Sequence, residues 1–312
     1  MKRNICLILL SPIILTAMGC SKPQEKEVTP TPEVSITPEP VDVVVISGQS
    51  NAVGCTHSEC IPDSISSEKY LEYFNGYPTI QIAFDSWTKD WPASGGVTFY
   101  SQNASRQNDF VKVTLGQGNG PYTFGPEIGI AEAMHEKYAN KLFLIKYACG
   151  ASNLKDDWTT RKSPMYGRFI EYVKLQMNNL VKKGYAPKIK AFCWMQGEGD
   201  SYPGYHQVYQ DNLREFVSNV REDLKDLYES KLPFIDAGIS NSPEWQFYRE
   251  VNDAKKAFAE ESEDNTFIDT IAAGLHVDKE PFTTVDMCHY DSESEVLLGH
   301  LFAEAFEKYL AK

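Results

Sequence analysis

The chain has 312 residues, of which 42% are hydrophobic and 12% aromatic, and its formal net charge is −13. This composition excludes an intrinsically disordered protein, and the length allows a large core that needs neither disulfides nor metal ions to fold. Because negative charge repels phosphate backbones, we expect no nucleic acid among its partners.

Residues 1–19 have the features of an export signal. Lys2 and Arg3 precede a mostly apolar run, Ile5 to Ala17, which is shorter than the about 20 residues of a membrane-spanning helix. The run ends in LTAMGC, residues 15–20, which resembles a bacterial lipobox. That resemblance implies a lipoprotein signal peptide over residues 1–19 and lipidation of Cys20. An ordinary signal peptide with a cysteine near its cleavage site is the alternative.

Residues 20–40 contain five prolines among Thr, Ser and Glu, a composition that favours an extended tether. We therefore expect an exported bacterial lipoprotein that is anchored in a membrane and faces the periplasm or the cell exterior. Its globular domain would span residues 41–312 and would contact the membrane only through the N-terminal lipid.

Five short apolar runs predict buried strands, at residues 41–47, 141–147, 189–195, 232–239 and 266–271. Helical patterns occupy residues 127–138, 166–183, 205–229, 245–261 and 293–310. Because strands alternate with helices, we expect an α/β fold with a mostly parallel sheet and helices on both faces. Residues 55–125 are rich in Gly, Ser, Asn and aromatics, and we interpret them as an elaborated insertion, with short β pieces, in the same domain.

Five cysteines lie within the predicted domain, so at least one would stay unpaired in an oxidising compartment. Cys55 and Cys60 are close enough in sequence to form a disulfide, and free thiols are the alternative. With His57 they also resemble three metal ligands, but no fourth ligand is evident and we expect no metal. Cys149 and Cys193 end apolar runs and are predicted to be buried thiols.

Small and polar residues follow the predicted strands at the point where each strand ends. Residues 48–51 follow the first strand, residues 149–152 the second and residues 196–200 the third. Asp286 and His289 come shortly before the last helix. Since ligands bind at the carboxyl ends of the strands in open α/β sheets, we expect these residues to converge at one edge.

The residues at this edge suit acyl transfer. The hydroxyl of Ser50 needs a base to become a good nucleophile, and His289 can supply it. Asp286 lies three residues before His289, so its carboxylate can share one side of a turn with the imidazole and orient it. The backbone N–H groups of Ser50 and Gly150 and the side-chain amide of Gln196 are suitable donors to an oxyanion. Taken singly, Ser50 and Asp286 could also be helix caps.

Four blocks of sequence together resemble a known superfamily. They are GQSN at residues 48–51, GASNLKDDW at residues 150–158, WMQGEGD at residues 194–200 and DMCH at residues 286–289. The chain resembles the SGNH (GDSL-like) hydrolases, specifically the sialate O-acetylesterase and carbohydrate esterase family 6 branch, from about residue 41 to residue 310. The second block has one glycine where the branch often has two, and Gly199 stands where serine is frequent.

The resemblance implies a flavodoxin-like three-layer α/β/α fold. It also implies a serine esterase that removes O-acetyl groups from carbohydrates through an acyl-enzyme, without a metal or cofactor. Carried over by position, Ser50 is the nucleophile, His289 the base and Asp286 its orienting acid. Gly150 and Gln196 are oxyanion donors beside the Ser50 N–H.

Other residues of the blocks have less specific interpretations. Glu198 and Asp200 are expected to support the site, because Asp286 already fills the acid position, although Glu198 could assist His289. We expect the glycine-rich loop at residues 116–120 to border the cleft. Several tryptophans could stack on sugar rings, although aromatic side chains more often belong to the core: Trp87, Trp91, Trp158 and Trp194.

The partner would be an acetylated carbohydrate, either a polysaccharide such as xylan or an O-acetylated sialic acid or other glycan. One alternative is a non-catalytic carbohydrate-binding lipoprotein on the same fold, which would not need Ser50, Asp286 and His289 together. A second is a short-chain lipase or thioesterase of the same superfamily. No long apolar lid is evident in the sequence, which disfavours long acyl chains.

Overall fold

The structure is a computed structural model that describes residues 37–63, 65–90, 97–138, 141–281 and 283–310. The predicted signal peptide, Cys20 and most of the predicted tether lie outside the described residues, so lipidation and export stay predictions. From Pro38 onward the chain belongs to one compact unit. Among the helices that the structure describes, none is long and apolar enough to span a bilayer.

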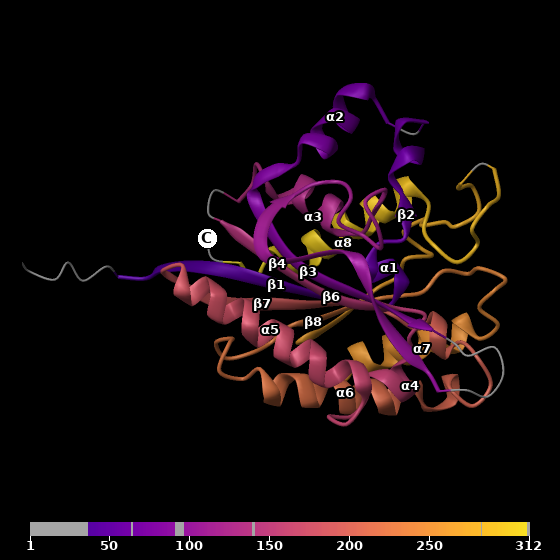
Figure 1. Ribbon diagram of the computed structural model, residues 1–312. Helices are drawn as coiled ribbons and strands as arrows, with labels where there is room; N and C mark the ends of the chain where they lie inside the picture. Colours follow the sequence, from indigo (N-terminus) through magenta and orange to yellow (C-terminus); the bar gives the residue numbers. More distant parts are fainter. Residues whose placement is uncertain (1–36, 64, 91–96, 139–140, 282, 311–312) are drawn as a thin grey trace, which may run out of the picture. The chain divides into compact units, whose positions relative to one another are not determined.

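A seven-stranded sheet runs through this unit in the order β4-β3-β6-β1-β7-β8-β9 (Figure 1). β1 (Glu39–Gly48) lies at its centre and pairs in parallel with β6 (Leu142–Gly150) and β7 (Tyr185–Met195). Beyond β7 the parallel sheet continues with β8 (Phe234–Ala237) and β9 (Asn265–Ile268). On the other side β3 (Tyr77–Asp90) pairs in parallel with β6, and β4 (Phe99–Val113) forms an antiparallel edge.

The inner strands are buried on both faces, which explains their apolar sequences. Residues 43–46 of β1 and residues 142–145 of β6 are at most 1% exposed. Burial of each such aliphatic or aromatic side chain contributes roughly 1.5–3 kcal/mol. These strands therefore form the stable centre whose carboxyl ends hold the site.

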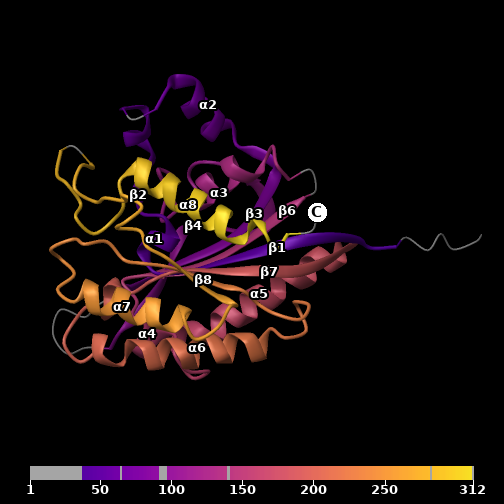
Figure 2. The ribbon, with the colours of Figure 1, turned by 180° about the vertical axis from the view of Figure 1, so that it is seen from behind.

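Helices cover both faces of the sheet, as Figures 1 and 2 show. α3 (Glu127–Met134) and α8 (Ser292–Glu307) lie on one face, and α5 (Pro164–Lys182), α6 (Tyr209–Asp223) and α7 (Tyr248–Ala259) on the other. α3 and α8 approach closely at Gly129, where an added Cβ would lie 2.0 Å from the carbonyl oxygen of Val296. The expected three-layer α/β/α fold is confirmed.

The predicted insertion at residues 55–125 holds more regular structure than expected. It contains the 3-10 helix η1 (Ser58–Asp63), α2 (Ser67–Asn75) and a small sheet of β2 (Thr56–His57) and β5 (Thr123–Phe124), as well as β3 and β4. The two long strands complete the central sheet instead of decorating it. Most side chains of β4 are exposed or half-buried because the strand forms the sheet edge, so its sequence lacks the apolar run of an inner strand.

The helix predicted at residues 205–229 is shorter in the structure. A 3-10 turn, η3 (His206–Val208), precedes α6, which ends at Asp223. The carbonyl oxygen of Leu227 accepts the N–H of Ile189 in β7 at 2.9 Å. Residues after Asp223 therefore turn back to the sheet instead of continuing the helix.

Candidate active site

Ser50 lies at the turn between β1 and the short helix α1 (Ser50–Val53). The turn depends on Gly48, whose φ of +144° suits glycine, and an added Cβ there would lie 1.9 Å from the carbonyl oxygen of Met195. The N–H of Gln49 donates to that same oxygen at 2.9 Å. The backbone that precedes Ser50 is therefore held against β7, and the half-buried side chain of Ser50 lies at the sheet edge.

Asp286 and His289 form a hydrogen-bonded pair. Oδ2 of Asp286 lies 2.5 Å from Nδ1 of His289, and Oδ1 accepts the Cys288 N–H at 2.9 Å. Burial raises the pKa of Asp286, but the hydrogen bond and charge of His289 outweigh it and hold that pKa below its ordinary value. Burial lowers the pKa of His289, but hydrogen bonds to Asp286 and Cys55 outweigh burial and raise the pKa overall. The pair leaves Nε2 of the imidazole for a further partner.

The loop that carries this pair is closed at its base by two buried carboxylates. Glu280 accepts the N–H of Ser292 at 2.7 Å and its hydroxyl at 2.8 Å. Asp291 accepts the Glu280 N–H at 2.8 Å and lies 2.5 Å from Nδ1 of His276. The N–H of Asp286 in turn donates to the carbonyl oxygen of Glu280 at 2.9 Å. These contacts fix the position of Asp286 relative to α8.

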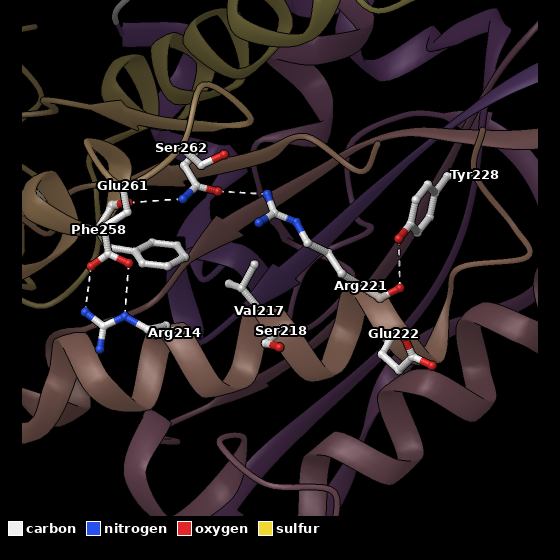
Figure 3. Close-up of a pocket in the computed structure, with 10 residues that line it drawn as sticks. Arg214, Val217, Ser218, Arg221, Glu222, Tyr228, Phe258, Glu261 and Ser262 are labelled. Carbon is white, nitrogen blue, oxygen red and sulfur yellow. Dashed lines mark hydrogen bonds and ion pairs between the residues drawn. The ribbon is translucent and has the colours of Figure 1, made fainter. Parts of the chain in front are cut away.

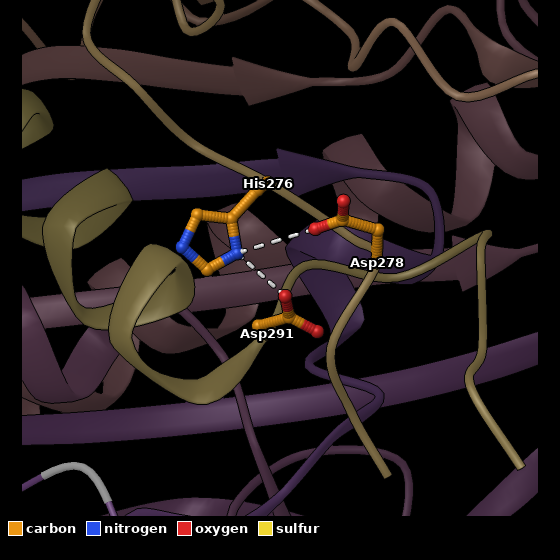
Figure 4. A group of neighbouring side chains, drawn as sticks. All are labelled: His276, Asp278 and Asp291. Atoms are coloured by element: carbon orange, nitrogen blue, oxygen red, sulfur yellow. Dashed lines mark hydrogen bonds and ion pairs between the residues drawn. The ribbon is translucent and has the colours of Figure 1, made fainter. Parts of the chain in front are cut away.

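His276, Asp278 and Asp291 come close enough together to be considered as metal ligands (Figure 4). Nδ1 of His276 is 4.0 Å from Asp278 and 2.5 Å from Asp291. However, both carboxylate oxygens of Asp291 already accept backbone N–H groups of the loop, and the ammonium of Lys279 lies 3.0 Å from Nε2 of His276. We interpret this group as support for the loop, because a neighbouring cation disfavours a bound metal ion.

Ser50, Gly150 and His289 all line one cavity of about 670 Å³ at the carboxyl edge of the sheet. The aromatic side chains of its lining are Tyr202, Tyr205 and Trp245, and its other polar or small lining residues are Gln49, Cys55, Thr88, Asn119, Ala151, Asn153, Gly199 and Cys288. Within the described part of the chain, this lining contains no Lys, Arg, Asp or Glu. The cavity is therefore suited to a neutral ligand with both flat apolar faces and hydroxyl groups.

Gly150 lies beside the nucleophile, as predicted, whereas Gln196 does not reach the cavity. A Cβ added at Gly150 would lie 3.9 Å from the Cβ of Ser50. Gln196 is fully buried, and its Nε2 donates to Asp200 at 2.6 Å and to Gln49 at 3.2 Å. Both amide hydrogens of Gln196 thus have acceptors inside the protein, and none is directed to a substrate in this arrangement.

Glu198 and Asp200 lie in the 3-10 turn η2 (Glu198–Asp200) and hold neighbouring segments of the site in place. Glu198 accepts a hydrogen bond from Asn51 at 2.7 Å, and burial raises the pKa of its carboxyl group. Asp200 accepts the N–H of Leu154, the first residue of α4 (Leu154–Asp157), at 2.6 Å, and burial raises its pKa to about 6. The two carboxyl groups connect the first, second and third sequence blocks.

The structure places the aromatic residues and cysteines more specifically than the sequence does. Trp158 and Trp194 are fully buried in the core, whereas Trp245, which the sequence analysis missed, lines the cavity. Trp91 lies outside the described residues.

Cys55 is a free thiol, so it has no disulfide to Cys60. In the described residues, Cys55, Cys60 and His57 form no cluster with metal-ligand spacing.

A second hollow, of about 430 Å³, lies along α6 and contains none of the predicted site residues (Figure 3). Its two arginines are already paired: Arg214 with Glu261 at 2.6 Å, and Arg221 with Asn265 at 2.7 Å. These pairs leave no evident chemistry for a substrate there.

Comparisons with known proteins bear on the family and the fold of this chain. The family model described as carbohydrate esterase, sialic acid-specific acetylesterase matches residues 40–308. A protein from Arabidopsis thaliana has a similar fold, with a TM-score of 0.60 and 21% identity over 87% of this chain and 100% of its own. NanS has a TM-score of 0.58 and 14% identity over 88% of this chain and 98% of its own.

A carbohydrate acetylesterase from Xanthomonas citri has a TM-score of 0.51 and 13% identity over 86% of this chain and 56% of its own. At these identities the likenesses show the shared fold. No curated protein matches the chain in sequence. The family match covers nearly all of the described domain, and the chain therefore belongs to the carbohydrate esterases of the sialic acid-specific acetylesterase family.

Proposed function

We propose that this protein hydrolyses O-acetyl esters of neutral carbohydrates, with Ser50 as the nucleophile. The observation that carries the proposal is the Asp286–His289 pair, 2.5 Å apart, at the same cavity as Ser50. A binding protein on this fold would not need a nucleophile, a base and an orienting acid together.

In the proposed reaction, His289 accepts the proton of Ser50 as its Oγ attacks the acetyl carbonyl carbon. Asp286 holds the imidazole with Nδ1 protonated, which leaves Nε2 as the nitrogen that takes the proton of Ser50. His289 then gives its proton to the sugar oxygen as the ester bond breaks. The sugar alcohol departs, and Ser50 stays acetylated. Water attacks this ester with His289 again as the base, and acetate leaves. The N–H groups of Ser50 and Gly150 are donors to the oxyanion of both steps.

The choice of a neutral sugar rests on the cavity lining. Sugar rings stack on aromatic faces, and Tyr202, Tyr205 and Trp245 offer three. An O-acetylated sialic acid carries a carboxylate, and among the described lining residues there is no Lys or Arg to pair with it. Lys155 lies outside the lining, with its ammonium 4.6 Å from the ring centre of Tyr205 and bonded to the carbonyl oxygen of Gly204.

Acetate release by residues 38–312 tests this proposal. The substrates are para-nitrophenyl acetate, acetylated xylo-oligosaccharides and an O-acetylated sialic acid. Ser50→Ala should lose all turnover, whereas Ser47→Ala should not, because the buried Ser47 hydroxyl makes no hydrogen bond to any described residue. Turnover by a folded Ser50→Ala protein would refute the mechanism. A higher kcat/KM for the sialic acid ester than for the neutral ester would refute the substrate class alone.

A series of nitrophenyl esters separates this proposal from a lipase or thioesterase of the same superfamily. An acetylesterase should lose kcat/KM steeply beyond acetate or propionate. A rate that stays constant or rises to octanoate would favour the lipase.

A further inference from the structure

We propose that Gln49 is a catalytic residue whose side-chain amide donates to the oxyanion, an inference that rests on the esterase function proposed above. Gln49 directly precedes the nucleophile and lines the same cavity as Ser50, Gly150 and His289. It is only 3% exposed, and the surface it reaches is that of the cavity. Neither spacing nor composition distinguishes it from Gln196, which the sequence analysis favours for this role.

Hydrogen bonds fix which end of the Gln49 amide faces the cavity. The backbone N–H groups of Gly197 and Gly199 point to one amide atom, at 3.3 and 3.0 Å, and Nε2 of Gln196 points to it at 3.2 Å. Backbone N–H groups can only donate, so this atom is the carbonyl oxygen Oε1. Nε2 of Gln49 therefore points away from these three donors.

The hydrogens of Gln49 Nε2 have no acceptor among the described residues. The same atom is not sealed from solvent, in contrast to Trp194 Nε1, which is buried without a partner. A free amide donor that is open to the cavity next to a nucleophilic serine has the features required to stabilise a negative oxygen there.

The third sequence block holds this donor in place. Nε2 of Gln196 donates one hydrogen bond to Asp200 at 2.6 Å and a second to Oε1 of Gln49. The hydroxyl of Tyr209 lies 3.1 Å from both Oε1 and the backbone carbonyl oxygen of Gln196, and its hydrogen is shared between these two acceptors. A donor fixed in this way costs little reorganisation when charge develops, and successive hydrogen bonds strengthen one another. Gln196 and Asp200 thus act as positioning residues behind Gln49.

The reaction gives the donor its purpose. When Oγ of Ser50 attacks, the electron pair of the carbonyl bond moves to the acetyl oxygen, which becomes negative. Nε2–H of Gln49 would meet this oxygen together with the N–H groups of Ser50 and Gly150. Loss of one such donor typically costs about 10²–10³ in rate.

The variant Gln49→Glu tests the inference with little change in shape. One carboxylate oxygen replaces Oε1 and keeps its three donors, while the other replaces Nε2 with an acceptor. We expect kcat/KM for para-nitrophenyl acetate to fall by at least about 10²–10³, with KM within about threefold of wild type. The Ki of phenylboronic acid, whose adduct with Ser50 is tetrahedral, should rise by a similar factor. The near-ultraviolet circular dichroism spectrum should match that of the wild type, which checks that the variant is folded.

Asn119→Asp is the control for the added charge, because it makes the same amide-to-carboxylate change at an exposed position of the same cavity lining. It should lower kcat/KM by less than about tenfold. The inference is overturned if Gln49→Glu keeps more than about a third of wild-type kcat/KM, or if Asn119→Asp loses as much. Activity in the wild type and its absence in Ser50→Ala would leave the proposed function standing in either case.

Discussion

The buried ion pair of Lys146 and Glu127, next to the end of α1, gives a stability prediction with a defined magnitude. Lys146 in β6 and Glu127 in α3 are both 0% exposed and lie 2.7 Å apart. Nζ of Lys146 also donates to the carbonyl oxygens of Val53 at 2.9 Å and Gln117 at 2.8 Å. The ammonium therefore connects the end of α1 to the glycine-rich loop and to α3.

The variant Lys146→Met keeps an unbranched side chain but removes the charge and three hydrogen bonds. The carboxylate of Glu127 then stays buried, and among the described residues the N–H of Gly125, at 2.9 Å, is its remaining hydrogen-bond donor. Leaving one member of a buried pair without its partner costs about 3–5 kcal/mol. We expect a loss of that size in the free energy of unfolding, measured by urea denaturation, out of a total of about 5–15 kcal/mol for a typical domain.

Two further variants make this prediction refutable. In Lys146→Met/Glu127→Gln neither position of this pair carries a charge, so the double variant should recover at least half of the lost stability. Lys137→Met removes one member of an exposed pair with Glu307, 3.5 Å apart, and should cost less than about 1 kcal/mol. The reasoning fails if Lys146→Met costs no more than Lys137→Met, or if the double variant is no more stable than Lys146→Met alone.

Three other predictions concern the site. His289 must be neutral to accept a proton and its pKa is raised, so kcat/KM should rise with pH above about 6.5. Asp286→Asn should move this rise in kcat/KM to lower pH. A rise in wild-type kcat/KM that is complete below about pH 6.5 would contradict this prediction. Gly48→Ala should fail to fold, because its Cβ would lie 1.9 Å from a backbone oxygen. Gly150→Ala, whose Cβ has its nearest contact at 3.7 Å, should fold normally and show a lower kcat/KM. Equal urea unfolding midpoints of the two variants would refute this contrast. Iodoacetamide should inactivate the enzyme by alkylating Cys55, whose thiol is in contact with His289. The variant Cys55→Ser should keep its activity after the same treatment. A protein that mass spectrometry shows to be alkylated on Cys55 and that stays fully active would be evidence against this prediction.

The sequence predicts the centre of this fold well because the central strands have one dominant constraint. Residues 43–46 are buried on both faces, so an apolar run is the expected signature. β4 escapes prediction because an edge strand has no such requirement. β3 lies inside the sheet, between β4 and β6, but polar residues interrupt its sequence, so it shows no continuous apolar run. The Asp286–His289 contact follows from a three-residue spacing, which is local and needs no knowledge of the fold.

The arrangement of the amides is different. Gln49 and Gln196 are both glutamines near the strand ends, and only the positions of the Gly197 and Gly199 N–H groups show which amide is open to the cavity. Trp245 was missed for a similar reason: its sequence pattern places it at the start of a helix, whereas it lies in the connection between β8 and α7. Such loop residues reach the site through tertiary packing, which a single sequence does not encode locally.

Covalent labelling tests the central claim, that Ser50 is the nucleophile, most directly. The protein would be treated with phenylmethanesulfonyl fluoride, and the modified residue identified by peptide mass spectrometry together with the loss of acetate release. We expect one sulfonyl group on Ser50, in proportion to lost activity, with much slower labelling in His289→Ala and none in Ser50→Ala. Complete inactivation with the adduct on another residue, or full labelling of Ser50 in a protein that stays active, would contradict the proposed mechanism.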